Sequence, residues 1–220
     1  LMLTVKNQRD QSRLLLSASA SLPLLYFTEK NKPGPAAAPG FCMLLRKHIG
    51  GGKILSVTQP GLERILRLEV EHLDEMGDVC RKFLIIELMG KHSNIIFTDS
   101  EDKILDSIKH ISLNVSSVRE VLPGRPYFIP ETTHKENPLA ISEEDFYSKI
   151  CTLPQATAKA LYMGLTGISP LMAEEICFRA GLDSAQPMQA LGEAERLHLF
   201  HTFSHLMDDV RQERFTPNIV

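Results

Sequence analysis

Residues 83–98 read FLIIELMGKHSNIIFT. Two apolar runs, Phe83–Met89 and Asn94–Thr98, flank the short polar stretch Gly90–Ser93. Apolar runs of this length, rich in isoleucine and phenylalanine and bounded by turn-forming residues, are typical of buried β-strands. The stretch therefore predicts two neighbouring strands joined by a turn in a sheet-based domain.

Shorter apolar runs on both sides predict more strands. Leu1–Val5 and Arg13–Ser17 are separated by a polar stretch, as in a β-hairpin. A strand that begins at Lys53, a turn at Pro60–Gly61 and a strand with alternating apolar residues follow. A further alternating run begins at Ile104. This part of the chain therefore predicts a mixed, mostly antiparallel sheet domain.

One helix is predicted within this domain, over Phe41–Ile49. Its apolar residues recur at intervals of three and four, which places them on one face, with Arg46 and Lys47 on the other side. A loop rich in proline and alanine precedes the helix at Asn31–Gly40. Three glycines at positions 50–52 end it, since glycine tolerates the left-handed conformation common at helix ends.

After a polar, proline-flanked segment at Glu131–Pro138, the pattern is helical to the end. Ser142 precedes three acidic residues, which is typical of a helix N-terminus. Further helices are expected at Thr157–Leu165, Ser169–Ala180 and Glu193–Val210. The predicted fold class is α+β, with the sheet domain over residues 1–135 and a small all-helical domain over residues 139–220.

Composition and charge narrow the function classes. Of the 220 residues, 43% are hydrophobic and 23% charged, as in an ordinary globular protein, which argues against a disordered or collagenous chain. The net charge is −3, whereas a protein that binds nucleic acid by bulk charge is normally basic. A nucleic-acid partner therefore requires a local positive patch. Apolar runs such as Leu22–Phe27 are too short to cross a bilayer, so we expect no membrane partner.

The cysteines bear on the cellular compartment, and the first residue bears on where the chain begins. The cysteines, at positions 42, 80, 151 and 177, form no Cys-x-x-Cys pair, so they predict free thiols in a reducing cytoplasm rather than a zinc site. Leu1 is not an initiator methionine and already reads as part of a strand. We therefore expect the chain to begin inside a longer protein.

Signatures of catalysis are missing from the sequence. It contains no Gly-x-Ser-x-Gly elbow, phosphate-binding loop, His-Glu-x-x-His or Gly-x-Gly-x-x-Gly. His198, His201 and His205 have helical spacing, so a metal site is conceivable, but three ligands on one face of a terminal helix do not favour one. We therefore predict no enzyme, no catalytic residue, no cofactor, no metal and no small-molecule substrate.

The stretch Ala160–Ile176 has the shape of a helix-hairpin-helix. Gly167 frees the backbone of the turn, and Pro170 suits the first turn of the next helix. Backbone amides at such a helix start can bind a phosphate without side-chain charge. Ser169 stands where DNA-binding versions usually carry a second glycine. A helical hairpin that only packs is the alternative.

Glu63 and Arg64 stand side by side after the Pro60–Gly61 turn. An arginine here can contact a phosphate or stack on a base, while the carboxylate accepts from a base amine or orients the guanidinium. A solvated ion pair at a strand start is the alternative. Further candidate contacts with an RNA backbone are Arg46, Lys47, Lys91, His92, Ser93, Asn94, Lys109, Gly167 and Ser169. A plain turn is the favoured interpretation for Lys91, His92, Ser93 and Asn94, and a solvated charged face explains Arg46, Lys47 and Lys109 equally well.

Several motifs in fixed order resemble the NFACT family, and together they cover nearly the whole chain. They are Phe41–Ile49, Gln59–Ile65, Glu87–Ile96, Ile104–His110, Val121–Gly124, Gly167–Pro170 and Arg214–Asn218. The family includes the bacterial RqcH group, is similar to eukaryotic NEMF, and is often labelled fibronectin-binding protein. The resemblance assigns this chain to most of an NFACT-N domain and the helix-hairpin-helix domain behind it.

The resemblance implies a ribosome quality control factor. Such a protein would bind a large ribosomal subunit that carries peptidyl-tRNA, recruit alanyl-tRNA and support alanine tailing of the stalled chain. Peptide-bond chemistry would belong to the ribosome. The family's Asp-Arg pair, implicated in tRNA recruitment, aligns with Glu63 and Arg64, so the acid here is one methylene longer. Complete family members continue into a coiled coil and a basic C-terminal domain.

Two other function classes stay open at this point. The older label implies a surface adhesin that binds fibronectin, which surface labelling of intact cells would detect. The implied fold is also similar to the N-terminal domain of formamidopyrimidine-DNA glycosylases, which raises a DNA-processing protein. Those enzymes use an N-terminal proline nucleophile and a zinc finger, and neither is visible in this sequence.

Overall fold

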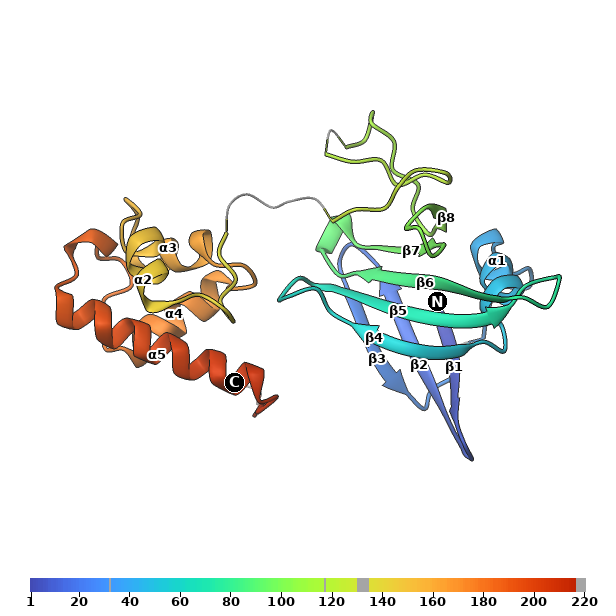
Figure 1. The fold of residues 1–220 in the computed structure, drawn as a ribbon, viewed down its shortest axis with the longest axis horizontal. Helices are drawn as coiled ribbons and strands as arrows, with labels where there is room; N and C mark the ends of the chain where they lie inside the picture. The colour runs from blue at the N-terminus through green and yellow to red at the C-terminus, as the bar shows by residue number, and fades with distance from the viewer. Residues whose placement is uncertain (32, 117, 130–134, 217–220) are drawn as a thin grey trace. The chain divides into compact units, whose positions relative to one another are not determined.

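The structure, a computed structural model, describes residues 1–31, 33–116, 118–129 and 135–216. Within these residues, eight strands form two antiparallel sheets (Figure 1). The smaller sheet has the order β1 (Met2–Asn7), β2 (Asp10–Ala18), β3 (Pro23–Thr28). The larger sheet has the order β4 (Lys53–Thr58), β5 (Ile65–Leu73), β6 (Val79–Glu87), β7 (Asn94–Thr98), β8 (Ile104–Ser107). The predicted antiparallel sheet architecture is confirmed.

The stretch 83–98 forms the most buried strands of the larger sheet. In β6 and β7, the two apolar triplets 84–86 and 95–97 are each 0% exposed. Ile85 pairs with Ile96 in the antiparallel register. The connection between the strands contains a 3₁₀-helix over Gly90–His92 rather than a bare turn, and Gly90 has a φ of +57°. Glycine suits that left-handed backbone because it lacks a Cβ.

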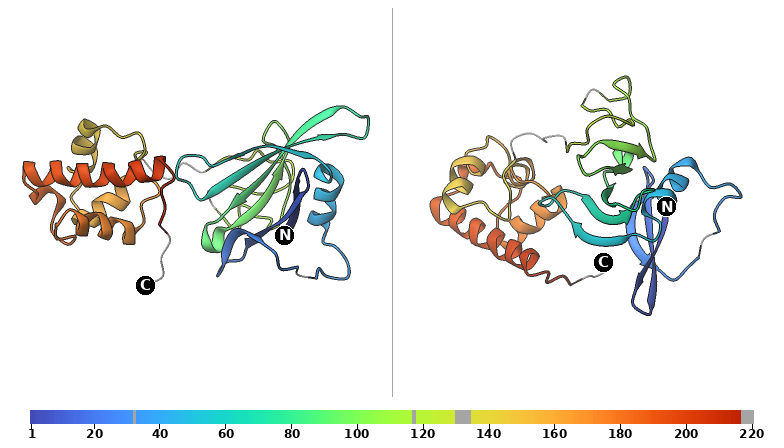
Figure 2. Two further views of the ribbon diagram at one scale, coloured as in Figure 1. Left: turned by 90° about the horizontal axis from the view of Figure 1, so that it is seen from below. Right: turned by 45° about the vertical axis from the view of Figure 1, so that its right-hand side comes forward.

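The two faces of the larger sheet are covered by different parts of the chain. One face packs against β2 and against α1 (Gly40–Ile49), which Figure 2 shows beside the sheets. The other face holds Ile65, Ile85 and Ile96, which pack with residues of the irregular segment that follows β8, among them Val121 and Tyr127. Because both faces are covered, β6 and β7 read as continuous apolar runs rather than alternating ones.

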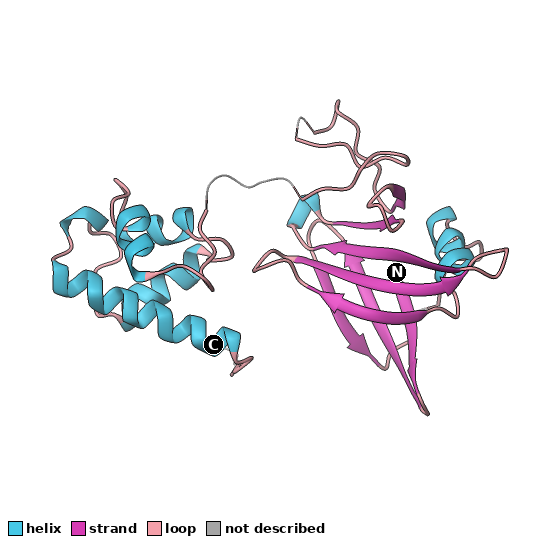
Figure 3. Ribbon diagram, viewed as in Figure 1, coloured by secondary structure: helices cyan, strands magenta, loops and turns pink. Residues whose placement is uncertain are grey.

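Residue contacts divide the chain into two units, one formed by residues 1–60 and 64–130 and one by residues 61–63 and 131–220. Helices dominate the second unit (Figure 3). They are α2 (Glu143–Asp145), the π-helix Phe146–Ile150, α3 (Thr157–Gly164), α4 (Pro170–Arg179), a 3₁₀-helix at Met188–Ala190 and α5 (Glu193–Arg211). The predicted helices agree with α3, α4 and α5 to within one residue at each end. The helix-hairpin-helix assignment stays a prediction.

The helical unit has a core of its own. Phe146 stacks on Phe203 of α5 with ring centroids 5.3 Å apart, and both side chains are buried. Ser142 caps the first helix, since its Oγ accepts from the backbone N–H of Asp145 at 3.1 Å. The predicted N-cap is therefore confirmed. Residues 131–134 of the predicted linker, and Pro217 and Asn218 of the last motif, lie outside the described residues.

Gly52, between α1 and β4, offers a test of the packing. A Cβ at this position would lie 2.8 Å from both the carbonyl oxygen of Glu71 and the Cγ1 of Val70. We expect Gly52→Ala to lower the free energy of unfolding by about 1–3 kcal/mol, because overpacking forces backbone shifts. Gly40→Ala is the matched control, since nothing lies within 4 Å of its Cβ position. Equal urea midpoints for the two variants would contradict the packing described here.

Candidate nucleic-acid interface

Arg64 lies immediately before β5, and its side chain is exposed. Its carbonyl oxygen accepts a hydrogen bond of 2.8 Å from the backbone N–H of Leu88, the residue that follows β6. The backbone is thus held by the sheet while the guanidinium faces solvent. Glu63, the neighbouring acid, is half-buried.

The strand register brings further predicted residues to the same end of the sheet. Ile65 pairs with Glu87, and Glu87 pairs with Asn94, so the start of β5, the end of β6 and the start of β7 are adjacent. Lys91 and His92, which lie in the 3₁₀-helix between β6 and β7, are exposed. We call this end of the larger sheet, marked by Arg64, Lys91 and His92, the arginine end.

Ser93, Asn94 and Lys109 have a different place. Ser93 and Asn94 are buried, at 0% and 2% exposure. The Asn94 side chain donates from Nδ2 to the carbonyl oxygen of Lys109 at 2.9 Å and accepts from the backbone N–H of Lys109 at 3.0 Å. Lys109 Nζ donates to the carbonyl oxygen of Ser93 at 2.8 Å. These polar atoms therefore tie the segment after β8 to the start of β7, and contact with RNA by them stays a prediction.

Arg46 and Lys47 lie at the opposite end of the sheet. Lys47, in the last turn of α1, forms an exposed ion pair of 2.8 Å with Glu75, which lies in the turn after β5. β5 has nine residues, so its two ends are about 26 Å apart at the usual strand rise. The structure therefore does not bring Arg46 and Lys47 together with Arg64.

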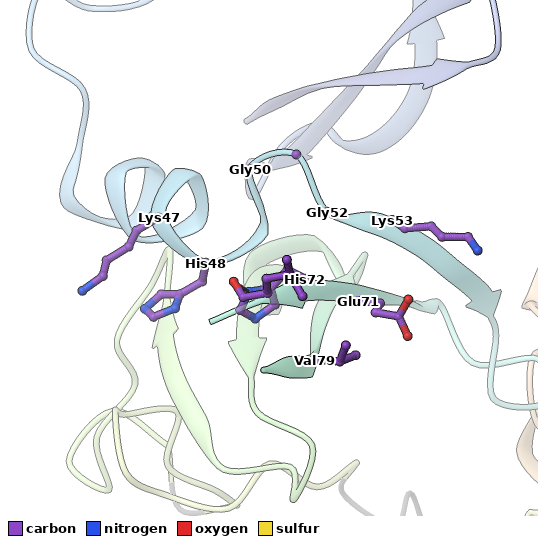
Figure 4. A pocket seen from close by; sticks show the side chains of 10 residues that line it. Lys47, His48, Gly50, Gly52, Lys53, Glu71, His72 and Val79 are labelled. Carbon is purple, nitrogen blue, oxygen red and sulfur yellow. Dashed lines mark hydrogen bonds between the residues drawn. The ribbon is translucent and has the colours of Figure 1, made fainter. Parts of the chain in front are cut away.

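A hollow near that opposite end is lined by residues of α1, the glycine turn and the ends of β5 and β6 (Figure 4). His72, which is 9% exposed, lies with Nδ1 2.9 Å from the carbonyl oxygen of Leu73 and Nε2 3.1 Å from Lys82 Nζ. Because the lysine can only donate, Nε2 of His72 is the acceptor in this contact and Nδ1 is the donor to Leu73. Burial, followed by the charges of Lys82 and Lys47, lowers the pKa of His48.

Gly167 and Ser169 lie between α3 and α4 in the helical unit. Gly167 has a φ of +76°, which explains the glycine at this turn. Ser169 is the N-cap of α4, and its Oγ accepts from the backbone N–H of Met172 at 3.1 Å. Both residues are exposed. The glycine and the N-cap serine therefore lie where the sequence predicts them, while the helix-hairpin-helix assignment and the binding of a phosphate stay predictions.

A buried polar network was not found from the sequence. The Glu87 carboxylate, 0% exposed, has its two oxygens 2.6 and 2.5 Å from Nη2 of Arg119, and it accepts from the Tyr127 hydroxyl at 3.0 Å. Burial opposes the charge on Arg119, but the hydrogen bond and the charge of Glu87, together with Tyr127, outweigh it and raise the pKa of Arg119. Burial, then the Glu87 charge, raises the pKa of Tyr127. Arg119 lies in an irregular segment, so no local pattern marks it.

Two of the cysteine thiols are held protonated, and no metal-binding cluster is found among the described residues. Burial raises the pKa of the Cys151 and Cys177 thiols to about 11, so neither is a reactive thiolate near neutral pH. Cys42 and Cys80 are half-buried. Within the described ranges, no group of three or more His, Cys, Asp or Glu side chains is placed to hold a metal ion. The described helices include none long and apolar enough to cross a membrane.

Comparison with known proteins defines the class. The family model for NFACT N-terminal and middle domains matches residues 1–220, and the chain therefore belongs to the NFACT family. It is 39% identical over 216 residues to the Rqc2 homolog RqcH of Bacillus subtilis (strain 168). That alignment covers 98% of this chain but only 36% of the relative, so the chain spans about a third of that length.

Solved structures of similar proteins have the same fold. The fibrinogen binding protein from Staphylococcus aureus matches with a TM-score of 0.78 and 31% identity, covering 96% of this chain and 70% of the other. The N-terminal part of the fibronectin/fibrinogen-binding protein from Streptococcus suis matches with a TM-score of 0.77 and 32% identity, covering 94% of this chain and 72% of the other. The α+β fold class is thus shown by relatives as well as by the structure.

The lowered pKa of His48 gives a pH prediction. A histidine whose pKa is lower in the folded state binds protons more readily when the protein is unfolded. The free energy of unfolding therefore rises with pH between the folded-state and the unfolded-state pKa of His48. We expect the free energy of unfolding to fall as the pH drops below about 6.5, the ordinary histidine value. Urea unfolding at several pH values should show a shallower fall in His48→Gln. An identical pH dependence in the parent protein and in His48→Gln would contradict the lowered pKa of His48.

Proposed function

We propose that this chain is the tRNA-binding part of a ribosome quality control factor. The complete protein would bind a large ribosomal subunit that carries peptidyl-tRNA. It would recruit alanyl-tRNA so that alanine residues are added to the C-terminus of the stalled chain. Membership in the NFACT family and the likeness to RqcH support this proposal.

The observation that carries the proposal is the exposed Arg64 on a backbone fixed by the sheet. The backbone N–H of Leu88 donates to the carbonyl oxygen of Arg64, so the position of the Arg64 backbone relative to the sheet is fixed. The exposed Lys91 and His92 lie at the same end of the sheet. This is the local patch that a chain of net charge −3 needs to bind a polyanion.

Each member of the proposed pair has a role that fits its chemistry. A guanidinium donates up to five hydrogen bonds in a planar fork, which suits a phosphate or the edge of a base. A carboxylate beside it accepts from a base amine or orients the arginine. Arg64 would supply the attraction, and Glu63 would add selectivity. Gly167 and Ser169 are separate candidates for RNA-backbone contacts in the helical unit.

We further propose that the chain is not an enzyme and acts in the cytoplasm. In this view the ribosome forms each peptide bond, and the factor only selects and holds the alanyl-tRNA. No cofactor and no small-molecule substrate are needed for that role. The raised thiol pKa values of Cys151 and Cys177 are consistent with it.

A second candidate function is adhesion to fibronectin or fibrinogen. The names of the two solved structures favour it, because they describe those proteins as fibronectin- or fibrinogen-binding. Surface labelling of intact cells distinguishes the two functions. Labelled protein on the surface would favour adhesion, and its absence with ribosome association would favour quality control.

Substitution of Arg64 tests the proposal. We expect Arg64→Ala to weaken tRNA binding about 10- to 100-fold, because a hydrogen bond to a charged group contributes about 1.5–3 kcal/mol. Arg64→Lys should be intermediate, since it keeps the charge and loses the fork. The unfolding temperature should not change because the side chain is exposed. Binding is measured by filter retention, and alanine tailing is followed in cells that carry the complete protein.

Arg81→Ala is the matched control for this experiment. Arg81 is also an exposed arginine of the larger sheet, with a side chain 57% exposed, and it lies near the far end of β6. It should bind tRNA like the parent protein. Equal losses in both variants would show a general charge effect, and unchanged tailing in Arg64→Ala would overturn the assignment of Arg64.

A further inference from the structure

The network of Glu87, Arg119 and Tyr127 has no place in the function described so far. It joins the last residue of β6 to the irregular segment that covers this face of the sheet. Arg119 also donates from Nη1 to the carbonyl oxygen of Phe128 at 2.7 Å, and its side chain is only 12% exposed. The Arg119 guanidinium is therefore hydrogen-bonded to groups within the protein and is largely shielded from solvent.

Stability alone does not explain such a network. Removal of two charges from water costs several kcal/mol, and the attraction between them often only offsets this cost. Apolar residues of the same volume would fill the site as well or better. What the network adds is a single arrangement, because the rigid guanidinium is held at two points, with Nη2 bound by both Glu87 oxygens and Nη1 by the carbonyl oxygen of Phe128.

The arrangement that the network fixes lies next to the proposed tRNA contact. Glu87 pairs with Ile65 across the sheet, and the residue after it, Leu88, donates to the carbonyl oxygen of Arg64. The residues that follow Glu87 in the chain lead to Lys91 and His92. The buried carboxylate of Glu87 is therefore next to the backbone segments that carry Arg64, Lys91 and His92.

We propose that Arg119 and Tyr127, acting through the Glu87 carboxylate, are positioning residues for Arg64. They hold the end of β6, which in turn holds the backbone of Arg64 and the start of the segment that carries Lys91 and His92. Neither Arg119 nor Tyr127 touches RNA in this arrangement. The inference rests on the proposed tRNA binding and extends it to residues far away in the sequence.

The test separates positioning from packing. A triple variant, Glu87→Leu with Arg119→Met and Tyr127→Phe, removes all polar groups of the network while it keeps their volume. We expect the complete protein with these changes to unfold at the parent temperature or higher, and yet to bind a tRNA transcript about tenfold more weakly. A triple variant that is as stable as the parent and binds tRNA equally well would overturn the proposal.

A double-mutant cycle with Arg64 identifies how Arg119 acts. If the network acts by positioning Arg64, its removal weakens tRNA binding much less when the Arg64 side chain is already absent. We expect the three network substitutions to lower the affinity for tRNA about tenfold in the parent protein and clearly less in the Arg64→Ala background. An equal loss of affinity in both backgrounds would show that Arg119 acts on the RNA independently of Arg64, which would also overturn the proposal.

Two further variants keep the result interpretable. If the triple variant does not fold, Tyr127→Phe removes one hydrogen bond and leaves the ion pair, and it should weaken binding about threefold; parent-like binding would count against positioning. Arg64→Ala is measured in parallel. Loss of binding in Arg64→Ala without loss in the network variants would overturn positioning alone. Parent-like binding by Arg64→Ala would overturn the proposed function and positioning with it.

Discussion

Burial of β6 and β7 on both faces is the constraint on which the rest of the structure depends. Their apolar triplets at 84–86 and 95–97 are completely buried, so each side chain has an assigned place. In a sheet, a slip of one residue would move every side chain to the opposite face. Here such a slip would turn the Glu87 carboxylate away from Arg119, so the buried charge also opposes the wrong register.

The candidate site follows from this register. Because β5, β6 and β7 are antiparallel neighbours, residues far apart in the chain meet where the strands begin and end. Arg64, Lys91 and His92 meet at one such end, while Lys47 pairs with Glu75 at the other. The same antiparallel order that builds the sheet therefore decides which of the basic residues can act together.

Much of this architecture could be predicted because it depends on local pattern. The buried strands, the helix α1 and the helices α3, α4 and α5 all carry their periodicity in the sequence. The partner of Glu87 could not be predicted, because Arg119 is 32 residues away in a segment without regular structure. Ser93 and Asn94 read as an exposed polar turn, yet both are buried. The Ser93 hydroxyl accepts from the nearby backbone N–H of Met89, and the partner of the Asn94 side chain, Lys109, lies beyond the next strand.

The net negative charge of the chain is compatible with a polyanionic ligand, because acidic residues such as Glu75 lie far from Arg64. At physiological salt, exposed charges more than about 8 Å apart are largely screened from each other. The two ends of β5 are about 26 Å apart, so acidic residues near Glu75 have little influence on Arg64. For a ligand at the arginine end, the net charge of −3 therefore weighs less than the local positive charges of Arg64 and Lys91. For that reason, the fixed geometry of the strand ends matters more for the proposed RNA binding than the total charge of the chain does.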